Sequence, residues 1–363
     1  MQAIAVFPSQ KRVDLLDIPK PQLNGRTDVL LKVREVGLCG TDREISSFEY
    51  GTPPRGSDHL VLGHESLAEV VEVGREVRSL KPGDLVVAMV RRPCPHPDCR
   101  PCRGGRPDFC VTGDYTERGI KGADGFLTDY VVEDETYLVR VPHALAEVAV
   151  LVEPLTVVAK ASDRTQSIFY GLPFEPGPQR GLVLGAGPIG LLGAMVLVAD
   201  GFETVVYSRD SEQSKQAELV RSLGAHYVSS TSNPLESLRE SSGEFDVVLE
   251  AVGFAPLMVG ATQVLKPNGV VALTGVPPET ATAELKVGRG LRNLVLRNEV
   301  VFGTVNAGRR DHLSAIHHLE QFMVLFPQSV RELITHRARL DEVPQMLKQK
   351  QGIKNVVEMD RAA

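Results

Sequence analysis

The stretch LVLGAGPIG, residues 182–190, decides the fold class that we expect for this chain. It joins a short apolar run to three glycines in the spacing G-x-G-x-x-G, and a second apolar run of helical length follows. This order predicts a buried strand, a tight turn and a helix. Gly185 allows the turn, Gly187 has no Cβ to obstruct a bound pyrophosphate, and Gly190 lets the helix approach the strand. Because the first N–H groups of the helix are unpaired, the stretch predicts a dinucleotide site, the alternative being a glycine-rich turn without a ligand.

The residues after this turn alternate between strand-length apolar segments and segments with helical spacing. The strand-like segments are VVYSRD, FDVVLEAVG and VVALTG, and the helical ones are SEQSKQAELVRSLGA and PLMVGATQVLKPNG. Alternation of this kind predicts parallel βαβ units with helices on both faces of a sheet, which is a doubly wound α/β (Rossmann) domain. Two later helices, HLSAIHHLEQFMVLF and LDEVPQMLKQKQ, and a last strand, NVVEMD, complete the expected elements.

The first 155 residues have a different character, with many Gly and Pro residues between short β-branched runs. The runs are DVLLKVREVG, LAEVVEVG, GDLVVAMV and LTDYVVED. They predict an irregular antiparallel β domain, which the helical segment PLTVVAKASDRTQSIF links to the next domain. A chain of 363 residues is long for one core. We therefore expect residues 1–155 and 326–363 to form one domain and residues 156–325 the nucleotide-binding domain.

Composition narrows the classes of partner. The net charge is −6 and no basic block occurs, which argues against nucleic acid and anionic membrane surfaces as partners. No apolar N-terminal segment and no run long enough to span a bilayer is visible, so a cytoplasmic protein is expected. Thiols stay reduced in the cytoplasm, and the five cysteines are therefore expected to be ligands rather than disulfide partners.

The end of the second expected strand bears on the choice of nucleotide. An Asp or Glu at that position typically binds the ribose 2′-hydroxyl of NAD, but this chain has Ser208 and Arg209. A hydroxyl and a guanidinium suit the 2′-phosphate of NADP, which a carboxylate would repel. Asp210 either opposes the phosphate or pairs with Lys215 in solvent. The sequence favours NADP, with NAD as a second cofactor.

Four cysteines lie close together in the segment CPHPDCRPCRGGRPDFC, with the spacing C-x4-C-x2-C-x7-C. Pro, Gly and Arg residues separate them, so the segment is expected to be a loop that wraps one tetrahedral zinc ion in a closed, structural site. Unliganded thiols are one alternative, and a zinc-ribbon interaction module is another that the acidic net charge argues against. The predicted ligands are Cys94, Cys99, Cys102 and Cys110.

The remaining cysteine, Cys39, stands in GLCGTDREI, and three further ligand types occur elsewhere. LVLGHES supplies His64 and Glu65 after a glycine, and LVEPLTV supplies Glu153 at the domain junction. Each has an ordinary interpretation, as a core thiol, a satisfied histidine or a surface carboxylate. Together with the nucleotide turn, however, Cys, His and Glu ligands with an open fourth position predict a catalytic zinc site.

These motifs resemble a known family. GLCGTD, GHES, the four-cysteine segment and LGAGPIG occur in the order typical of the zinc-containing medium-chain alcohol dehydrogenases, along essentially the whole chain. GTDREI, LVVAMVRRPC, DFCVTGDYTERGI and EPLTVVAKA resemble the glucose (aldose) 1-dehydrogenases within that family. The resemblance implies a GroES-like catalytic domain beside the Rossmann domain. It also implies an enzyme that transfers hydride from C1 of an aldose such as D-glucose to NAD(P), giving the lactone.

The resemblance further implies roles for individual residues. Cys39, His64 and Glu153 would surround the catalytic zinc, Glu65 would enter and leave its coordination shell, and Thr41 would hydrogen-bond the reacting substrate oxygen. The sugar would contact Thr41, Glu117, Glu153 and Asn306. The implied cofactor residues are Gly185, Gly187, Pro188, Ile189, Gly190, Ser208, Arg209, Leu273, Thr274, Gly275, Thr304, Val305 and Asn306. Val90 replaces an asparagine that contacts sugar in some members.

Two other functions remain open from the sequence. One is a zinc-dependent polyol or secondary-alcohol dehydrogenase with another sugar-like substrate, and the other is a non-catalytic NADP-binding redox sensor. We also expect a homo-oligomer, either a dimer or a tetramer. The segments NGVVALTGV and AELKVG are the expected source of a sheet edge for pairing between cofactor domains.

Overall fold

The computed structural model describes residues 1–174, 177, 179–279, 281, 288–349 and 351–359. These residues form two compact units. The first unit is Met1–Thr156, Asn306–Leu319 and Ile334–Ala363, and the second is Val157–Val305 and Glu320–Leu333. Residues 306–319 thus belong to the first unit and 320–333 to the second, whereas the sequence placed a single boundary near residue 325. Helical periodicity runs uninterrupted through α9 (Arg309–Leu325), so nothing in the sequence marks the change of unit within that helix.

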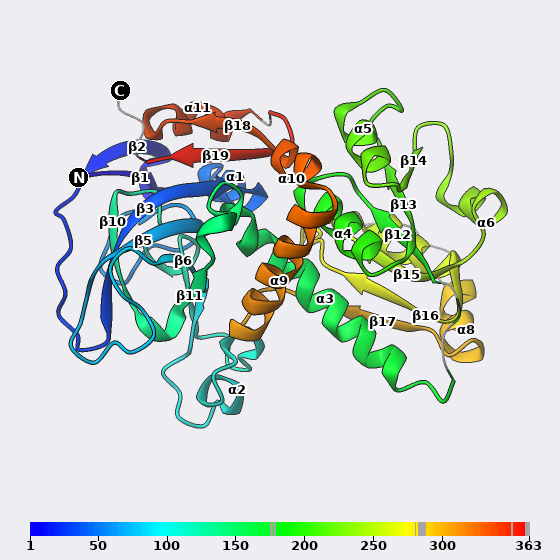
Figure 1. Cartoon of the computed structure of the whole chain (residues 1–363), viewed down its shortest axis with the longest axis horizontal. Helices are drawn as coiled ribbons and strands as arrows, with labels where there is room; N and C mark the ends of the chain where they lie inside the picture. The colour runs from blue at the N-terminus through cyan, green and yellow to red at the C-terminus, as the bar shows by residue number, and fades with distance from the viewer. Residues whose placement is uncertain (175–176, 178, 280, 282–287, 350, 360–363) are drawn as a thin grey trace. The chain divides into compact units, whose positions relative to one another are not determined.

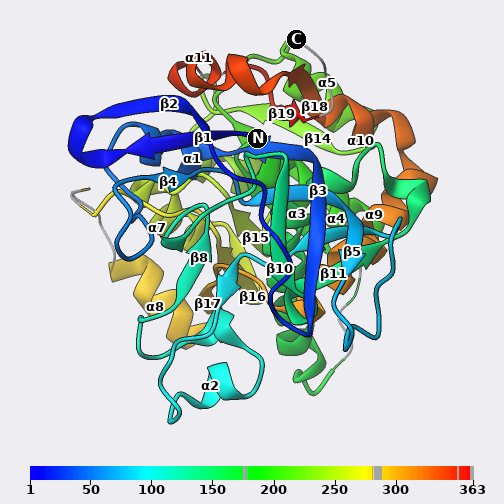
Figure 2. The same cartoon turned by 90° about the vertical axis from the view of Figure 1, so that its left-hand side faces the viewer.

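The first unit is built from three sheets of mostly antiparallel strands (Figure 2). One has the order β2-β1-β4, a larger one has the order β11-β6-β5-β3-β19-β18 with β10 also paired to β3, and a small one has the order β7-β8-β9. The strands are β1 (Gln2–Phe7), β2 (Arg12–Asp17), β3 (Asp28–Leu38), β4 (Leu60–Val61), β5 (Glu65–Val73), β6 (Leu85–Ala88), β7 (Arg91–Arg92), β8 (Thr116–Arg118), β9 (Gly122–Ala123), β10 (Tyr130–Asp134), β11 (Leu138–Val141), β18 (Ile334–Ala338) and β19 (Lys354–Glu358).

The core of this unit lies between the sheets, where β-branched and aliphatic side chains of β1, β3, β5 and β6 are buried together with Phe126 and Leu127. This unit also contains three short helices: α1 (Gly40–Ser46), α2 (Arg100–Arg103) and α11 (Val343–Lys348). The register of β3 against β5 pairs Gly37 with Glu65, and β19 pairs Asn355 with Leu38. The end of β3, the start of β5 and the start of β19 therefore meet at one place.

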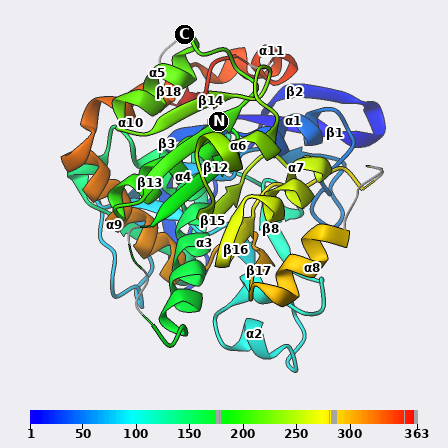
Figure 3. The same cartoon turned by 90° about the vertical axis from the view of Figure 1, so that its right-hand side faces the viewer.

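The second unit is a parallel sheet in the order β14-β13-β12-β15-β16-β17, with helices on both faces (Figures 1 and 3). Its strands are β12 (Arg180–Leu184), β13 (Glu203–Ser208), β14 (His226–Ser229), β15 (Phe245–Glu250), β16 (Leu265–Leu273) and β17 (Val300–Gly303). Its helices include α4 (Pro188–Ala199), α5 (Lys215–Ser222), α6 (Leu238–Ser241), α7 (Ala255–Gly260), α8 (Gly288–Leu296) and α10 (Pro327–Leu333). The helix α3 (Val152–Tyr170) begins in the first unit and continues into this one. The predicted doubly wound α/β class is confirmed.

One predicted helix is wrong at its end. The segment 256–269 was expected to be helical throughout, but α7 ends at Gly260 and β16 begins at Leu265. Pro267 cannot supply the N–H that a helix requires, and Asn268 has a left-handed backbone with φ of 66°. The sequence also gave no sign of α8, and the segment AELKVG lies outside the described residues except for Gly288. Among the described residues, no helix combines the length and apolar character needed to cross a bilayer.

Candidate functional site

The strand pairing of the first unit brings Cys39, His64 and Glu65 together. Cys39 follows β3 directly, and His64 and Glu65 stand where β5 begins. Cys39 Sγ lies 3.2 Å from His64 Nε2. One ligand atom from each of the three residues lies within 4.8 Å of the other two, which is the spacing that a shared metal ion requires.

The carboxylate of Asp42 orients two of these residues, Cys39 and His64. Asp42 Oδ2 accepts a hydrogen bond from the Cys39 backbone N–H at 2.8 Å, and Asp42 Oδ1 lies 3.5 Å from His64 Nδ1. The Thr41 backbone N–H donates to Cys39 Sγ at 3.2 Å. Burial lowers the pKa of His64, but the charges of Cys39 and Asp42 outweigh it and hold that pKa well above its usual value. The His–carboxylate pairing leaves Nε2 directed at the sulfur, as is usual for metal-binding histidines.

Two further charged residues surround the cluster. Lys354, fully buried at the start of β19, pairs with Glu65 and donates to the Leu38 carbonyl at 3.2 Å. A Cβ on Gly37 would clash with Glu65 Oε2, so a larger residue there would displace this carboxylate from its present position. Burial raises the pKa of Glu153 to about 7, with His64 opposing the rise and Glu65 adding to it.

Glu153 therefore belongs to the same charge cluster, although its carboxylate is outside the group whose ligand atoms lie within 4.8 Å. The cluster thus combines a partly buried thiol, a buried imidazole and two carboxylates, of which Glu65 is buried and Glu153 is partly buried. This donor set fits a divalent cation, which removes the cost of burying the carboxylates.

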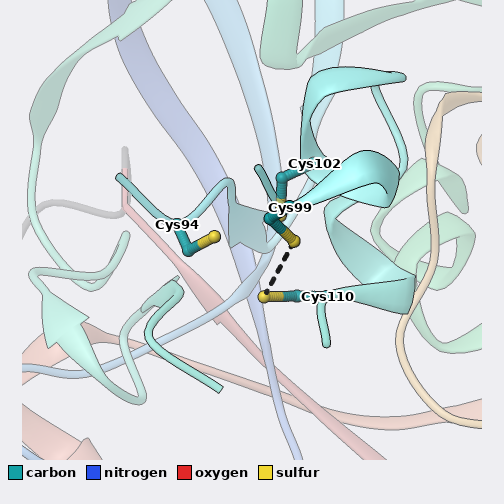
Figure 4. Close-up of side chains that lie close together, drawn as sticks. All are labelled: Cys94, Cys99, Cys102 and Cys110. Atoms are coloured by element: carbon teal, nitrogen blue, oxygen red, sulfur yellow. Dashed lines mark hydrogen bonds between the residues drawn. The ribbon is translucent and has the colours of Figure 1, made fainter. Parts of the chain in front are cut away.

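The four cysteines predicted to bind a second ion form one cluster, shown in Figure 4. Three of the thiols are buried and that of Cys110 is partly exposed. Cys99 Sγ and Cys110 Sγ lie 3.9 Å apart, and burial raises the pKa of Cys102 to about 12. Hydrogen bonds from Thr112 and Gly113 overcome burial at Cys110 and lower its pKa to about 6. A tetrahedral zinc ion would let all four ionise, so the cluster fits a closed metal site.

In the second unit, the predicted cofactor residues gather at the carboxyl edge of the parallel sheet. Gly185 has φ of 107° and ends β12, and a Cβ on Gly190 would lie 2.0 Å from the Gly185 carbonyl oxygen. A Cβ on Gly187 would meet no atom within 4 Å, which leaves space where a pyrophosphate is expected. The Thr304 N–H donates to the Leu273 carbonyl at 3.0 Å, so the segments after β16 and β17 are held side by side.

Ser208 and Arg209 follow β13 at the same edge of the sheet. The Ser208 hydroxyl donates to Asp210 Oδ2 at 2.9 Å, which turns that carboxylate back toward its own strand. Arg209 is exposed, and its side chain forms no hydrogen bond or ion pair with another described residue. The guanidinium is thus available to a ligand phosphate, while the predicted pairing of Asp210 with Lys215 is not among the contacts of the described residues.

Glu117 and Asn306, the predicted sugar-binding pair, meet in the first unit. Asn306 has a left-handed backbone with φ of 59°, and its Nδ2 donates to Glu117 Oε1 at 2.6 Å. Arg91, which the sequence did not single out, pairs with the same carboxylate. Asp42 and Lys354 were also missed as site residues. Only Asp42 had a local signal, because an acidic residue three positions after Cys39 is typical of a helix start.

The GroES-like strand arrangement, the nucleotide-binding sheet and the two clusters of metal-ligand type define an alcohol dehydrogenase of the zinc-containing class. Residues 25–143 match the alcohol dehydrogenase GroES-like domain, and residues 146–359 match the glucose dehydrogenase C-terminal family. The chain belongs to the glucose dehydrogenase family.

Individual relatives agree with this assignment. Glucose 1-dehydrogenase of Methanocella arvoryzae is 38% identical over 363 residues, covering 99% of each chain. Glucose 1-dehydrogenase 1 of Caldivirga maquilingensis is 43% identical over 344 residues, covering 94% of this chain and 93% of that one. The structure of Haloferax mediterranei glucose dehydrogenase in complex with NADP, Zn and gluconolactone has a TM-score of 0.90 and 32% identity, with both chains fully covered.

Proposed function

We propose that this protein is a zinc-dependent glucose 1-dehydrogenase that oxidises the C1 hydroxyl of an aldose to the lactone and reduces NADP, with NAD as a second acceptor. The observation that carries the proposal is the set of partly buried Cys39 and buried His64 and Glu65, whose ligand atoms lie within 4.8 Å of one another in a chain of this family. The relatives named glucose 1-dehydrogenase, and the Haloferax complex with NADP, Zn and gluconolactone, support the substrate and both cofactors.

The metal and cofactor residues are assigned as the sequence predicted. Cys39, His64 and Glu153 would hold the catalytic zinc, with Glu65 exchanging between the ion and Lys354. Cys94, Cys99, Cys102 and Cys110 would hold the structural zinc. The glycine turn at 185–190 would bind the pyrophosphate, Ser208 and Arg209 the 2′-phosphate, and the segments 273–275 and 304–306 would line the nicotinamide.

The chain's own residues would then bind the sugar and move its proton. Zinc supplies Lewis acidity that lowers the pKa of a substrate hydroxyl, and the nicotinamide supplies a hydride acceptor. Glu117 and Asn306 hold the sugar ring by hydrogen bonds, which fixes the distance and angle of C1. The Thr41 hydroxyl, in the first turn of α1, is partly exposed, and it would accept the proton of the C1 hydroxyl while releasing its own proton to solvent.

The proposal extends to the roles of the two domains, the cellular location and the oligomeric state. We infer that residues 1–155 with the C-terminal strands act as the catalytic domain and the parallel sheet as the cofactor domain. All five cysteines are free, which supports a reducing, cytoplasmic location. The strand β17 stands at the end of its sheet and α8 carries several exposed apolar side chains, which supports a homo-oligomer joined through this edge.

A spectrophotometric screen tests the function. Aldoses, polyols and secondary alcohols are offered with NADP or NAD, and zinc is measured in the same sample. We expect reduction of NADP with an aldose, lactone as the product and about two zinc ions per chain. Oxidation of polyols without aldoses would instead favour the polyol dehydrogenase. A folded, zinc-loaded protein that binds NADP but oxidises no alcohol would favour the redox sensor.

A further inference from the structure

The carboxylate of Glu117 is held by one of its oxygens only. The residue is 4% exposed, and three donors reach Oε1: Arg91 Nε at 3.0 Å, Arg91 Nη2 at 3.0 Å and Asn306 Nδ2 at 2.6 Å. No hydrogen bond from the described residues is recorded to Oε2. Because all three donors reach Oε1, the position of that oxygen is fixed, and Oε2 is the oxygen left to accept a ligand hydroxyl.

The side chain of Arg91 is held by contacts with three other residues. It pairs with Glu117 across β7 and β8, and its guanidinium lies over the Tyr115 ring, 3.7 Å from the ring centroid. Its Nη1 donates to the backbone carbonyl of Asp108 at 3.3 Å. The side chain is buried, so replacing it would remove the donors on Glu117 with no water-filled space to compensate. Arg91 therefore sets the direction of the Glu117 carboxylate.

Asp108 connects this arginine to the cysteine lobe, which we define as residues 94–110. The Asp108 carboxylate accepts two hydrogen bonds from Arg106, from Nε at 2.9 Å and from Nη2 at 2.7 Å. Arg106 Nη2 also reaches Asp311 Oδ2 at 3.4 Å, and that oxygen accepts the Gly308 N–H at 2.7 Å. The lobe thus contacts Asp311, which in turn accepts from the Gly308 N–H two residues after Asn306, the other donor to Glu117.

We propose that Arg91 is a positioning residue for sugar binding, and that the cysteine lobe sets the affinity for the sugar through Asp108 and Arg106. The inference rests on the proposed function in taking Glu117 as a sugar ligand. Two routes leave the lobe and converge on one carboxylate: Asp108 holds Arg91, and Arg106 with Asp311 holds the loop that carries Asn306. A metal bound by the four cysteines would then support substrate binding by keeping both donors in place.

A double-mutant cycle with Glu117→Gln and Arg91→Met tests the first part. We expect each single variant of the zinc-loaded enzyme to raise the KM for the sugar about tenfold and to leave the KM for NADP within about twofold. The KM of the double variant for the sugar should not exceed that of the single variant with the higher KM, because Arg91 acts through Glu117. Arg91→Lys, which keeps the charge over Tyr115, should recover part of the affinity. If Arg91→Met does not fold, Arg91→Lys replaces it in the cycle.

Independent, multiplying effects of the two substitutions would overturn the positioning role, as would an equal rise in the KM for NADP. The wild-type substrate screen separates this result from the proposed function. If only polyols are oxidised, the cycle is run on the best polyol, and coupling there still supports Arg91 as a positioning residue. If the folded, zinc-loaded protein oxidises none of the alcohols in the screen, both proposals are overturned.

A matched pair of arginines tests the role of the lobe. Arg106→Met breaks the contacts with Asp108 and Asp311 without touching Glu117, whereas Arg103→Met removes an exposed arginine of the same lobe. We expect Arg106→Met to raise the KM for the sugar about fivefold at unchanged zinc content, and Arg103→Met to match the wild type. Equal KM values for the two variants would overturn the link between lobe and sugar.

Discussion

Cys39 and His64 lie at the ends of two paired strands, and the thiol Sγ and the imidazole Nε2 are directed toward each other at 3.2 Å. Serine at position 39 would replace a soft, ionisable ligand by a hydroxyl that binds zinc poorly. We expect Cys39→Ser to lower kcat about a hundredfold or more and to reduce zinc from two ions per chain to one. Metal analysis and NADP titration of the same sample check this.

NADP affinity is the control in that experiment, because the glycine turn and Arg209 belong to the second unit and do not depend on the Cys39 thiol. We expect the Kd for NADP to stay within about twofold of the wild type. Wild-type turnover in a Cys39→Ser sample that holds one zinc ion per chain would show that Cys39 is not part of the catalytic site.

Arg209 gives a second prediction for a single residue. Its exposed guanidinium follows β13, and Ser208 holds the Asp210 carboxylate at 2.9 Å from its hydroxyl. Arg209→Ala should raise the KM for NADP about tenfold and leave the KM for NAD nearly unchanged, because only NADP carries the 2′-phosphate. Arg140→Ala, an exposed arginine on β11, is the control. Equal changes for the two nucleotides would contradict the phosphate contact.

At the scale of elements, the buried carboxylate of Glu133 helps to connect the strand β8, which carries Glu117, to the large sheet. Glu133 of β10 pairs with Arg92 of β7 and with Arg118 of β8, whose Nε lies 2.9 Å away. Burial raises the pKa of Glu133, but Arg118 and Arg92 outweigh it and hold the pKa below the ordinary 4.5. The carboxylate therefore stabilises the fold above that value, and the stabilisation disappears as the pH falls through the lowered pKa.

Glu133→Gln is expected to lower the free energy of unfolding by about 3 kcal/mol at pH 7, because two buried guanidinium groups lose their counter-charge. The difference between variant and wild type should shrink progressively below pH 4.5. Urea unfolding at a series of pH values measures both effects. Glu72→Gln, an exposed carboxylate on β5, should change little. A difference that stays constant with pH would show that charge is not the cause.

Elements were predictable where the determinants are local. The run DVLLKVREVG corresponds to β3 (Asp28–Leu38), and the glycines at 185–190 form the expected strand, turn and helix. Contacts between distant segments were not predictable without the resemblance. Asn306 reaches Glu117 across 189 residues, and Lys354 reaches Glu65 only because β19 adds to the edge of β3. Strand register decides such contacts, and periodicity within one segment carries no information about it.

At the scale of the whole molecule, we expect copies of the chain to associate through the outer edge of the second unit's sheet. No described strand pairs with the outer side of β17, and the neighbouring helix α8 exposes Val295 at 77% and Leu296 at 63%. An open strand edge and exposed apolar side chains are both unfavourable for a monomer in water. A symmetric contact between two copies would pair the edges and bury both helices at once.

Two glutamates introduced into α8 should therefore prevent the association of copies. The wild type is expected to have a molar mass of two or four times 39.5 kDa by light scattering after gel filtration. Val295→Glu combined with Leu296→Glu places like charges against their own symmetry mates, and the mass should fall by about half or more. Val324→Glu, at an 80% exposed site on α9, is the matched control and should keep the wild-type mass. If the double variant also keeps it, the copies associate through another face, and the open edge of β17 must be protected within the chain itself.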